Sequence, residues 1–206
     1  MTNFGFALTR RIALTGAVVA GVALAVSTGA AEARITNPPR SAVTVLSGGC
    51  YWGMESVFRH VKGVQSVVSG YATPTGTTSH AEAVRITYDP SQLSYRQILD
   101  VFFSVAHDPT QLNRQGPDEG TEYRSIVFVD GAPQRQLVHS YIDSLSAAHV
   151  YRKPIVTEVD ALQTFEPVAE SQQNFAEKHP DLPYIRINDA PKIQALERRY
   201  ARLYRD

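Results

Sequence analysis

The sequence contains a single cysteine, Cys50, among 206 residues. It therefore cannot form an internal disulfide, and it lacks the companion thiolates of a structural zinc site. The six histidines are scattered without ligand-like spacing, so the sequence predicts no metal site. Net charge is absent too: twenty basic residues balance twenty acidic ones, which gives no indication of a nucleic-acid partner.

The amino-terminal residues differ in composition from the rest of the chain. Arg10 and Arg11 precede an apolar run over residues 12–26, and small residues then lead to Ala31-Glu32-Ala33. This pattern is typical of a secretory signal peptide with an A-x-A cleavage site, because the run is short for a transmembrane helix. The paired arginines also resemble a twin-arginine signal. An uncleaved membrane anchor is the alternative.

These features predict the organisation of the chain. We expect residues 1–33 to be a signal peptide and residues 34–206 to form one domain, which is long enough for its own core. The expected location is exported, in the periplasm or cell envelope, without stable membrane association once the signal is cleaved.

Periodic patterns between Ala42 and Val129 predict the order strand, helix, strand, strand, helix, strand. Ser94 and Gln97 form a capping box for the second helix. This order predicts an α+β fold, a ferredoxin-like βαββαβ two-layer sandwich. The strands are expected over residues 42–46, 64–72, 82–88 and 123–129, with a further strand over residues 154–159. Extra C-terminal helices are expected to begin at Pro133 and Pro191.

Cys50 lies at a predicted turn from the first strand into the first helix, in the stretch Ser47-Gly48-Gly49-Cys50-Tyr51-Trp52-Gly53. The unpaired N–H groups and the positive dipole end of a helix favour a thiolate over a thiol. An unpaired cysteine in an exported protein is either buried and inert or present for chemistry. Its position at a helix start favours a nucleophile.

Glu82 is the carboxylate whose position is most informative. Strand alternation places it on the same face as Val84, Ile86 and Tyr88, which is the buried face. Burial would raise its pKa and suit it to act as a general acid, whereas a carboxylate at a fraying strand end would be exposed. The polar stretch over residues 107–122 is a second candidate, either as a binding loop or as solvated turns.

Two other functions are compatible with these residues. A cysteine-histidine hydrolase would need a histidine beside Cys50 and a third group that orients it. A non-catalytic binding module would use Cys50 only to fill the turn, although alanine or serine would do so without the risk of oxidation.

The motif Gly49-Cys50-Tyr51-Trp52-Gly53 resembles the GCFWG signature of the A-type peptide methionine sulfoxide reductases. Further blocks that resemble this family follow in the family's order between about Val43 and Phe128. They are Gly70-Tyr71-Ala72, His80-Ala81-Glu82-Ala83-Val84, Tyr88-Asp89-Pro90, His107-Asp108-Pro109-Thr110, Gln115-Gly116-Pro117-Asp118 and Gly120-Thr121-Glu122-Tyr123-Arg124-Ser125. The combination is highly specific, whereas no single block is.

The resemblance implies a thiol-dependent reduction of the S epimer of methionine sulfoxide, free or within oxidised proteins. It implies that Cys50 attacks the sulfoxide sulfur and becomes a sulfenic acid, while Glu82 protonates the oxygen. The substrate-binding residues implied by the resemblance are Tyr71 and Tyr123, which bind the oxygen, Asp118 in the loop, and Tyr51 and Trp52, which line the pocket for the methyl group.

The sequence departs from the family pattern after Val129, where many relatives have one or two cysteines that attack the sulfenic acid. None follows here, so the cycle cannot close within the chain. The expected partner is an external dithiol reductant such as a thioredoxin-like protein, and no bound cofactor is expected. The stretch Glu170-Ser171-Gln172-Gln173-Asn174-Phe175 matches the family only faintly, and no role is assigned to it.

Overall fold

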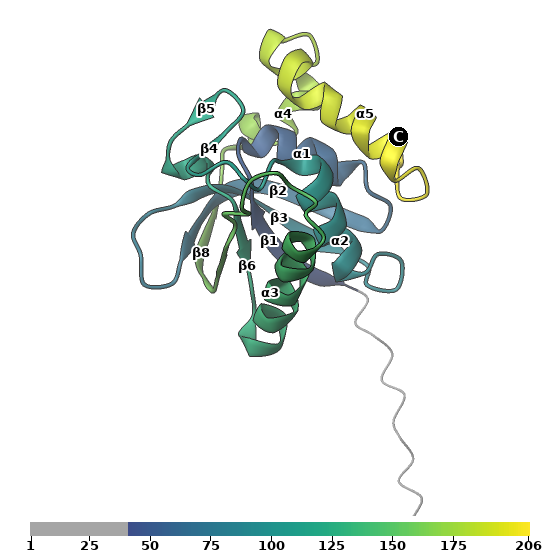
Figure 1. Ribbon diagram of the computed structural model, residues 1–206. Helices are drawn as coiled ribbons and strands as arrows, with labels where there is room; N and C mark the ends of the chain where they lie inside the picture. The colour runs from purple at the N-terminus through teal and green to yellow at the C-terminus, as the bar shows by residue number, and fades with distance from the viewer. Residues whose placement is uncertain (1–40) are drawn as a thin grey trace, which may run out of the picture. The chain divides into compact units, whose positions relative to one another are not determined.

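The computed structural model describes residues 41–206, and the predicted signal peptide lies outside the described residues. Its centre is a six-stranded mixed sheet with the strand order β7-β6-β1-β3-β2-β8 (Figure 1). The strands of this sheet are β1 (Ala42–Ser47), β2 (Val64–Pro74), β3 (Ala81–Tyr88), β6 (Ile126–Phe128), β7 (Glu158–Asp160) and β8 (Leu162–Pro167).

The inner four strands have the order β6-β1-β3-β2, in which β1 pairs antiparallel with both β3 and β6. Helix α1 (Tyr51–Arg59) connects β1 to β2, and helix α2 (Tyr95–Val101) follows β3 on the way to β6. This is the predicted ferredoxin-like βαββαβ core, which is confirmed. Strand β7 extends one edge by parallel pairing with β6, and β8 extends the other by antiparallel pairing with β2.

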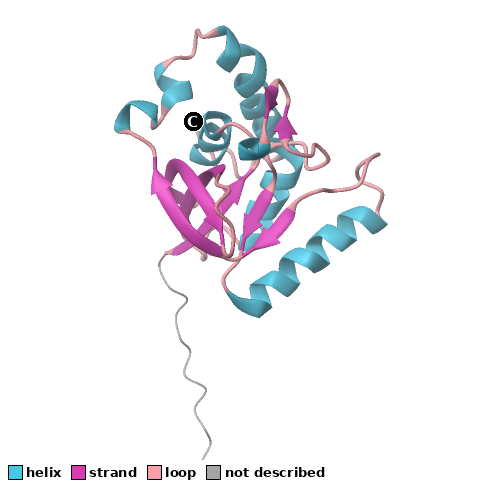
Figure 2. Cartoon of the chain, turned by 90° about the vertical axis from the view of Figure 1, so that its left-hand side faces the viewer, coloured by secondary structure: helices cyan, strands magenta, loops and turns pink. Residues whose placement is uncertain are grey.

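The larger of two hydrophobic core clusters within the described residues lies between one face of the sheet and the helices packed against it (Figure 1 and Figure 2). Leu46 and Ile86 from the sheet meet Met54 and Phe58 from α1 and Phe102 after α2, and all five side chains are fully buried. Helix α2 begins with the predicted capping box, in which the Ser94 hydroxyl accepts from the Gln97 N–H.

The carboxyl-terminal elements are α3 (Gly131–Ala147), α4 (Phe175–Lys178) and α5 (Ala190–Arg199). Helix α5 covers the sandwich from outside and packs against α1. Its Leu196 is fully buried in the same core cluster as the side chains of α1. In Figure 1 the yellow α5 lies beside α1. These are the extra C-terminal helices that the sequence predicted. No helix within residues 41–206 is long and apolar enough to span a membrane.

Several parts of the chain differ from the sequence prediction. The strand expected over residues 154–159 is β7, which begins only at Glu158. Tyr123 does not begin a strand: it ends a 3-10 helix (Thr121–Tyr123), and β6 starts only at Ile126. Gly120, with a φ of 144°, turns the chain into this helix, a conformation that favours glycine. The polar stretch before it is also more ordered than predicted, because β4 (Arg114–Gln115) and β5 (Asp118–Glu119) form a short hairpin.

Candidate active site

Cys50 precedes α1 directly, at the turn from β1 into the helix. Gly48 and Gly49 form this turn because the loop that follows α2 packs directly against it. A Cβ atom on Gly48 would lie 2.9 Å from the ring of His107, and one on Gly49 would lie 2.5 Å from the side chain of Gln115. The two glycines thus let the loop that carries Asp118 approach the thiol, which sits at a helix start as predicted.

Glu82 lies beside the thiol. Its Oε2 atom accepts a hydrogen bond from the backbone N–H of Tyr51, the residue after Cys50, at 2.9 Å. The side chain is 8% exposed, which confirms that it faces the core rather than solvent. The pKa of Glu82 is raised to about 7, chiefly by burial and in smaller part by the charges of Asp118 and Glu122, against the lowering effect of the hydrogen bond from Tyr51 N–H. Near neutral pH this carboxyl can therefore hold and release a proton.

Two tyrosines, Tyr71 and Tyr123, line the same pocket as this carboxyl. Tyr71 of β2 pairs across the ladder with Glu82 of β3, and its ring meets that of Tyr51 edge to face at 6.0 Å. Burial, followed by the charge of Glu82, raises the pKa of Tyr71 and raises that of Tyr123 to about 12. Both phenols therefore stay protonated and can donate hydrogen bonds to an oxygen bound near Glu82.

Aromatic rings form an apolar wall next to Cys50. Tyr51 and Trp52 meet edge to face at 6.1 Å, and Trp52 stacks on Phe175 at 4.0 Å. The indole N–H of Trp52 donates to Gln172, so the ring is fixed from the side of the carboxyl-terminal segment. Phe175 lies in the stretch to which the sequence assigned no role, and here it supports a ring of the site.

Tyr184 completes the site and was not predicted. Its hydroxyl donates to a carboxylate oxygen of Asp118, and its side chain lines the same pocket as Cys50 and lowers the pKa of that thiol. A pocket of about 230 Å³ brings Cys50, Pro117, Asp118, Tyr184 and Lys192 together. The local sequence offers no signal for Tyr184, because a single tyrosine between a proline and an isoleucine fits many surface turns. Only the path of the distant carboxyl-terminal chain places it there.

Burial of the thiol outweighs the effect of the helix start on its pKa. The pKa of Cys50 is raised to about 12, chiefly by burial and then by the negative charges of Glu82 and Asp189. The Trp52 N–H at the helix start and the Tyr184 hydroxyl lower it, but by less than burial raises it. The helix start thus favours a thiolate as predicted, but burial outweighs this effect in the resting protein, and the sequence does not show how deeply the thiol is buried.

His107 packs against the turn before Cys50, but both of its ring nitrogens are hydrogen-bonded to other groups. His107 is buried, and its two ring nitrogens are hydrogen-bonded to the Phe102 carbonyl and the Ser125 hydroxyl. Burial also lowers its pKa to about 4, so it stays neutral. The group placed beside Cys50 is thus the carboxyl of Glu82, which does not favour a cysteine-histidine hydrolase. No cluster of three or more His, Cys, Asp or Glu side chains suited to a metal ion occurs within the described part of the chain.

The fold and these groups define a class of protein. A buried thiol lies beside a carboxyl with a pKa of about 7, and the tyrosines Tyr71 and Tyr123 line the pocket of that carboxyl. On an α+β sandwich this is the arrangement of a thiol-dependent oxidoreductase. The chain belongs to the peptide methionine sulfoxide reductase family, because residues 42–203 match the family model of that description.

Curated relatives and solved structures agree with this assignment. "Peptide methionine sulfoxide reductase MsrA 2" of Mesorhizobium japonicum is 48% identical, over 81% of this chain and 91% of its own. MsrA of Natronomonas pharaonis is 46% identical, over 78% of this chain and 96% of its own. The structure resembles methionine sulfoxide reductase A of Corynebacterium diphtheriae, with a TM-score of 0.57, 32% identity and coverage of 69% and 77% of the two chains. Mxr1 of Saccharomyces cerevisiae in its reduced form has a TM-score of 0.62, 26% identity and coverage of 70% and 89%.

Proposed function

We propose that this protein reduces the S epimer of methionine sulfoxide, free or within proteins, with Cys50 as nucleophile and Glu82 as acid. The observation that carries the proposal is the 2.9 Å hydrogen bond from Tyr51 N–H to Glu82, which holds a carboxyl with a pKa of about 7 next to the thiol. A sulfoxide oxygen leaves sulfur readily only when it is protonated, so a protonated carboxyl beside a sulfur nucleophile suits this reaction.

The proposed first step balances without any other reagent. The Cys50 sulfur attacks the sulfoxide sulfur, and Glu82 gives its proton to the oxygen. The oxygen passes to Cys50, which becomes a sulfenic acid, and methionine leaves as the thioether. The thiol proton returns to Glu82, so the substrate sulfur is reduced by two electrons and Cys50 is oxidised by two.

The other residues receive binding roles in this proposal. Tyr71 and Tyr123 donate hydrogen bonds to the sulfoxide oxygen, where negative charge develops as the bond to sulfur breaks. Tyr51 and Trp52 provide the apolar wall for the methyl group. Asp118, held by the Tyr184 hydroxyl, lines the pocket that contains Cys50, where it can bind the polar part of the substrate.

An external thiol regenerates the enzyme in this proposal. The sequence has no second cysteine, so the sulfenic acid must be attacked by a thiol of another molecule, which releases water and leaves a mixed disulfide. A second thiol of that molecule then frees Cys50. A thioredoxin-like dithiol protein is the proposed reductant, and the structural relative Mxr1 has also been solved in complex with Trx2.

The proposed place of action is the periplasm or cell envelope. The support is the amino-terminal sequence alone, with Arg10 and Arg11 before an apolar run and the cleavage motif Ala31-Glu32-Ala33. If residues 1–33 form a cleaved signal, amino-terminal sequencing of the protein recovered from the periplasmic fraction will begin at Arg34. A full-length chain in the cytoplasmic fraction would contradict this assignment.

Mass spectrometry of Cys50 tests the reaction. The protein is mixed with one enantiomer of a small methyl sulfoxide, without reductant, and the sulfenic acid is trapped with a dimedone-type reagent. We expect trapping at Cys50 with the S enantiomer and one equivalent of thioether product. Trapping with both enantiomers, or with neither, would overturn the assignment.

A further inference from the structure

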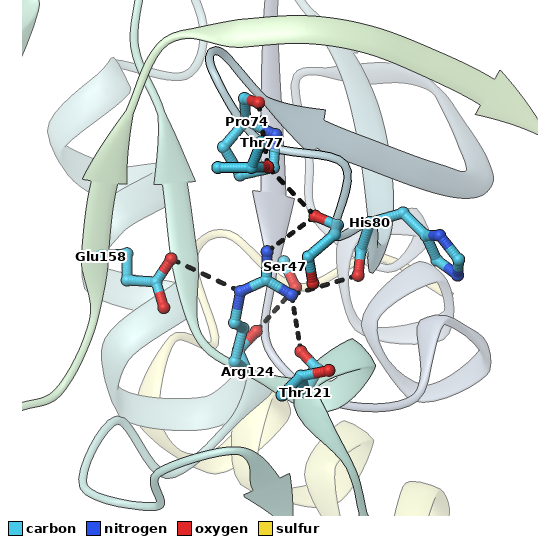
Figure 3. Close-up of polar contacts among 8 residues, drawn as sticks. Ser47, Pro74, Thr77, His80, Thr121, Arg124 and Glu158 are labelled. Carbon is cyan, nitrogen blue, oxygen red and sulfur yellow. Dashed lines mark hydrogen bonds and ion pairs between the residues drawn. The ribbon is translucent and has the colours of Figure 1, made fainter.

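Arg124 is a buried cation that connects two turns of the chain. Its side chain is 8% exposed. One terminal nitrogen of the guanidinium donates to the carbonyls of His80 at 3.1 Å and Thr121 at 2.7 Å, and the other donates to the carbonyl of Ser79 at 3.0 Å (Figure 3). The planar fork of arginine suits such simultaneous bonds, which a single ammonium group cannot reproduce.

The two turns carry different parts of the proposed site. Ser79 and His80 lead directly into β3, whose second residue is Glu82, and the His80 ring packs edge to face on Tyr71 at 5.0 Å. Thr121 begins the 3-10 helix that ends at Tyr123. Strand β3 pairs with β1 and β2, so its ladder does not include this 3-10 helix. The guanidinium of Arg124 bridges the two.

The backbone of Arg124 reaches a third segment. Its carbonyl accepts a hydrogen bond of 2.7 Å from the hydroxyl of Ser47, which is fully buried at the end of β1, three residues before Cys50. One residue therefore contacts the segments that carry the thiol, the acid and an oxygen-binding phenol. Its side chain makes the contacts to the segment before Glu82 and to the 3-10 helix that ends at Tyr123, whereas its backbone makes the contact to Ser47.

The ion pair of Arg124 is a minor part of this arrangement. Its Nε lies 3.4 Å from Glu158, whose side chain is 40% exposed, and exposed pairs of this kind contribute little. The three carbonyls, in contrast, accept charge-assisted hydrogen bonds at 2.7–3.1 Å. The bonding pattern is that of a group which fixes backbone positions.

We propose that Arg124 is a positioning residue, which holds Glu82 and Tyr123 in register with each other over Cys50. It touches neither the thiol nor the substrate in this proposal, and it acts through the carbonyls of Ser79, His80 and Thr121. The inference rests on the proposed function, because it concerns the geometry of the acid and the phenol during sulfoxide reduction. A misplacement of about 1 Å far from the reacting atoms can cost about a hundredfold in rate.

The test separates the chemical step from the state of the thiol. In Arg124→Met, the single-turnover rate of Cys50 oxidation by a small S-methyl sulfoxide is expected to fall about 10- to 100-fold. The sulfoxide concentration for half-maximal rate is expected to change by less than about threefold, because the Trp52 wall is intact. Alkylation of Cys50 by iodoacetamide is expected to keep its rate, since the bond from Ser47 goes to a backbone carbonyl.

Further variants keep the test decisive if Arg124→Met is unstable. Arg124→Lys retains the charge but not the fork and is expected to lose part of the rate. Arg124→Ala is expected to regain rate in millimolar guanidinium ion but not in the same concentration of ammonium ion. Glu158→Gln leaves the three carbonyl contacts in place and is expected to cost less than about threefold.

Arg135→Met is the matched control, because Arg135 also donates to a backbone carbonyl, that of Val159, away from the site. It is expected to react at the wild-type rate. A wild-type single-turnover rate in Arg124→Met, or an equal loss in alkylation and reduction, would overturn the proposal. If the wild-type protein itself forms no sulfenic acid, the proposed function fails instead.

Discussion

Glu82→Gln is expected to slow the oxidation of Cys50 by methyl sulfoxide about 10²- to 10⁴-fold, the loss typical of a positioned general acid. The substitution is nearly isosteric, and its amide oxygen can still accept the Tyr51 N–H that Glu82 accepts at 2.9 Å. What disappears is the proton, because an amide cannot transfer one to the sulfoxide oxygen near neutral pH. Rapid-quench measurement of thioether release in a single turnover reports this step without the reductant.

Glu55→Gln is the matched control for this substitution. Glu55 is also a buried carboxyl whose pKa burial raises, but it accepts hydrogen bonds from Ser69 and Asn174 and does not line the proposed site. Its amide variant is expected to react within about threefold of wild type, after correction for the folded fraction. A near-wild-type rate for Glu82→Gln would show that the proton comes from another group.

The pH dependence of the first turnover follows from the same carboxyl. The pKa of Glu82 is about 7, so the acid is protonated below this pH and ionised above it. Ionisation removes the proton donor and also places a negative charge beside Cys50, which opposes formation of the thiolate. We expect a plateau below about pH 7 and a fall of about tenfold per pH unit above it, and we expect Glu82→Gln to lack this descending limb. A rate that rises through pH 7–9 would contradict the acid role.

The fold could be predicted where local patterns determine it. Alternation in β3, the capping box at Ser94 and the glycine turn before Cys50 are short-range features, and they define the four-strand core. Strand β8 was missed because its residues, apart from Phe165, are largely exposed and its pairing with β2 is a long-range contact. Tyr123 was placed in a strand because its neighbours have β propensity, whereas Gly120 and Arg124 fix a 3-10 turn.

In the candidate site, too, features of the local sequence could be predicted and long-range contacts could not. The sequence placed Cys50 and Glu82 correctly, one at a helix start and the other on a buried strand face, and the structure brings them together. It did not reveal Tyr184 or the support of Trp52 by Phe175, because this tyrosine and this phenylalanine both lie more than a hundred residues after Trp52, whose ring they contact. The raised pKa of the thiol was missed for a related reason: the helix start that lowers it is visible in the sequence, whereas the burial that raises it is a property of the assembled fold.

Cys50→Ser is expected to abolish sulfoxide reduction, with a loss on the order of a millionfold, as for other enzymes that lose their nucleophile. A serine hydroxyl is not ionised near neutral pH and, unlike a thiol, cannot take up the oxygen and be reduced again by an external thiol. The fold should persist, because Cys50 is the N-cap residue of α1 and serine is a preferred residue at that position. The melting temperature is therefore expected to stay the same or rise slightly.

This variant also separates binding from chemistry. Tyr71, Tyr123 and the Trp52 wall remain in Cys50→Ser, so it should still bind the S enantiomer of a methyl sulfoxide in calorimetric titration, and more tightly than the R enantiomer. The same titration of Trp52→Ala, in which the stacking on Phe175 is lost, is the control for specific binding. Residual turnover in Cys50→Ser would assign the nucleophile elsewhere. Binding without enantiomer preference would instead mean that selectivity arises only as the thiol attacks, while Glu82 holds its proton toward the oxygen of one enantiomer.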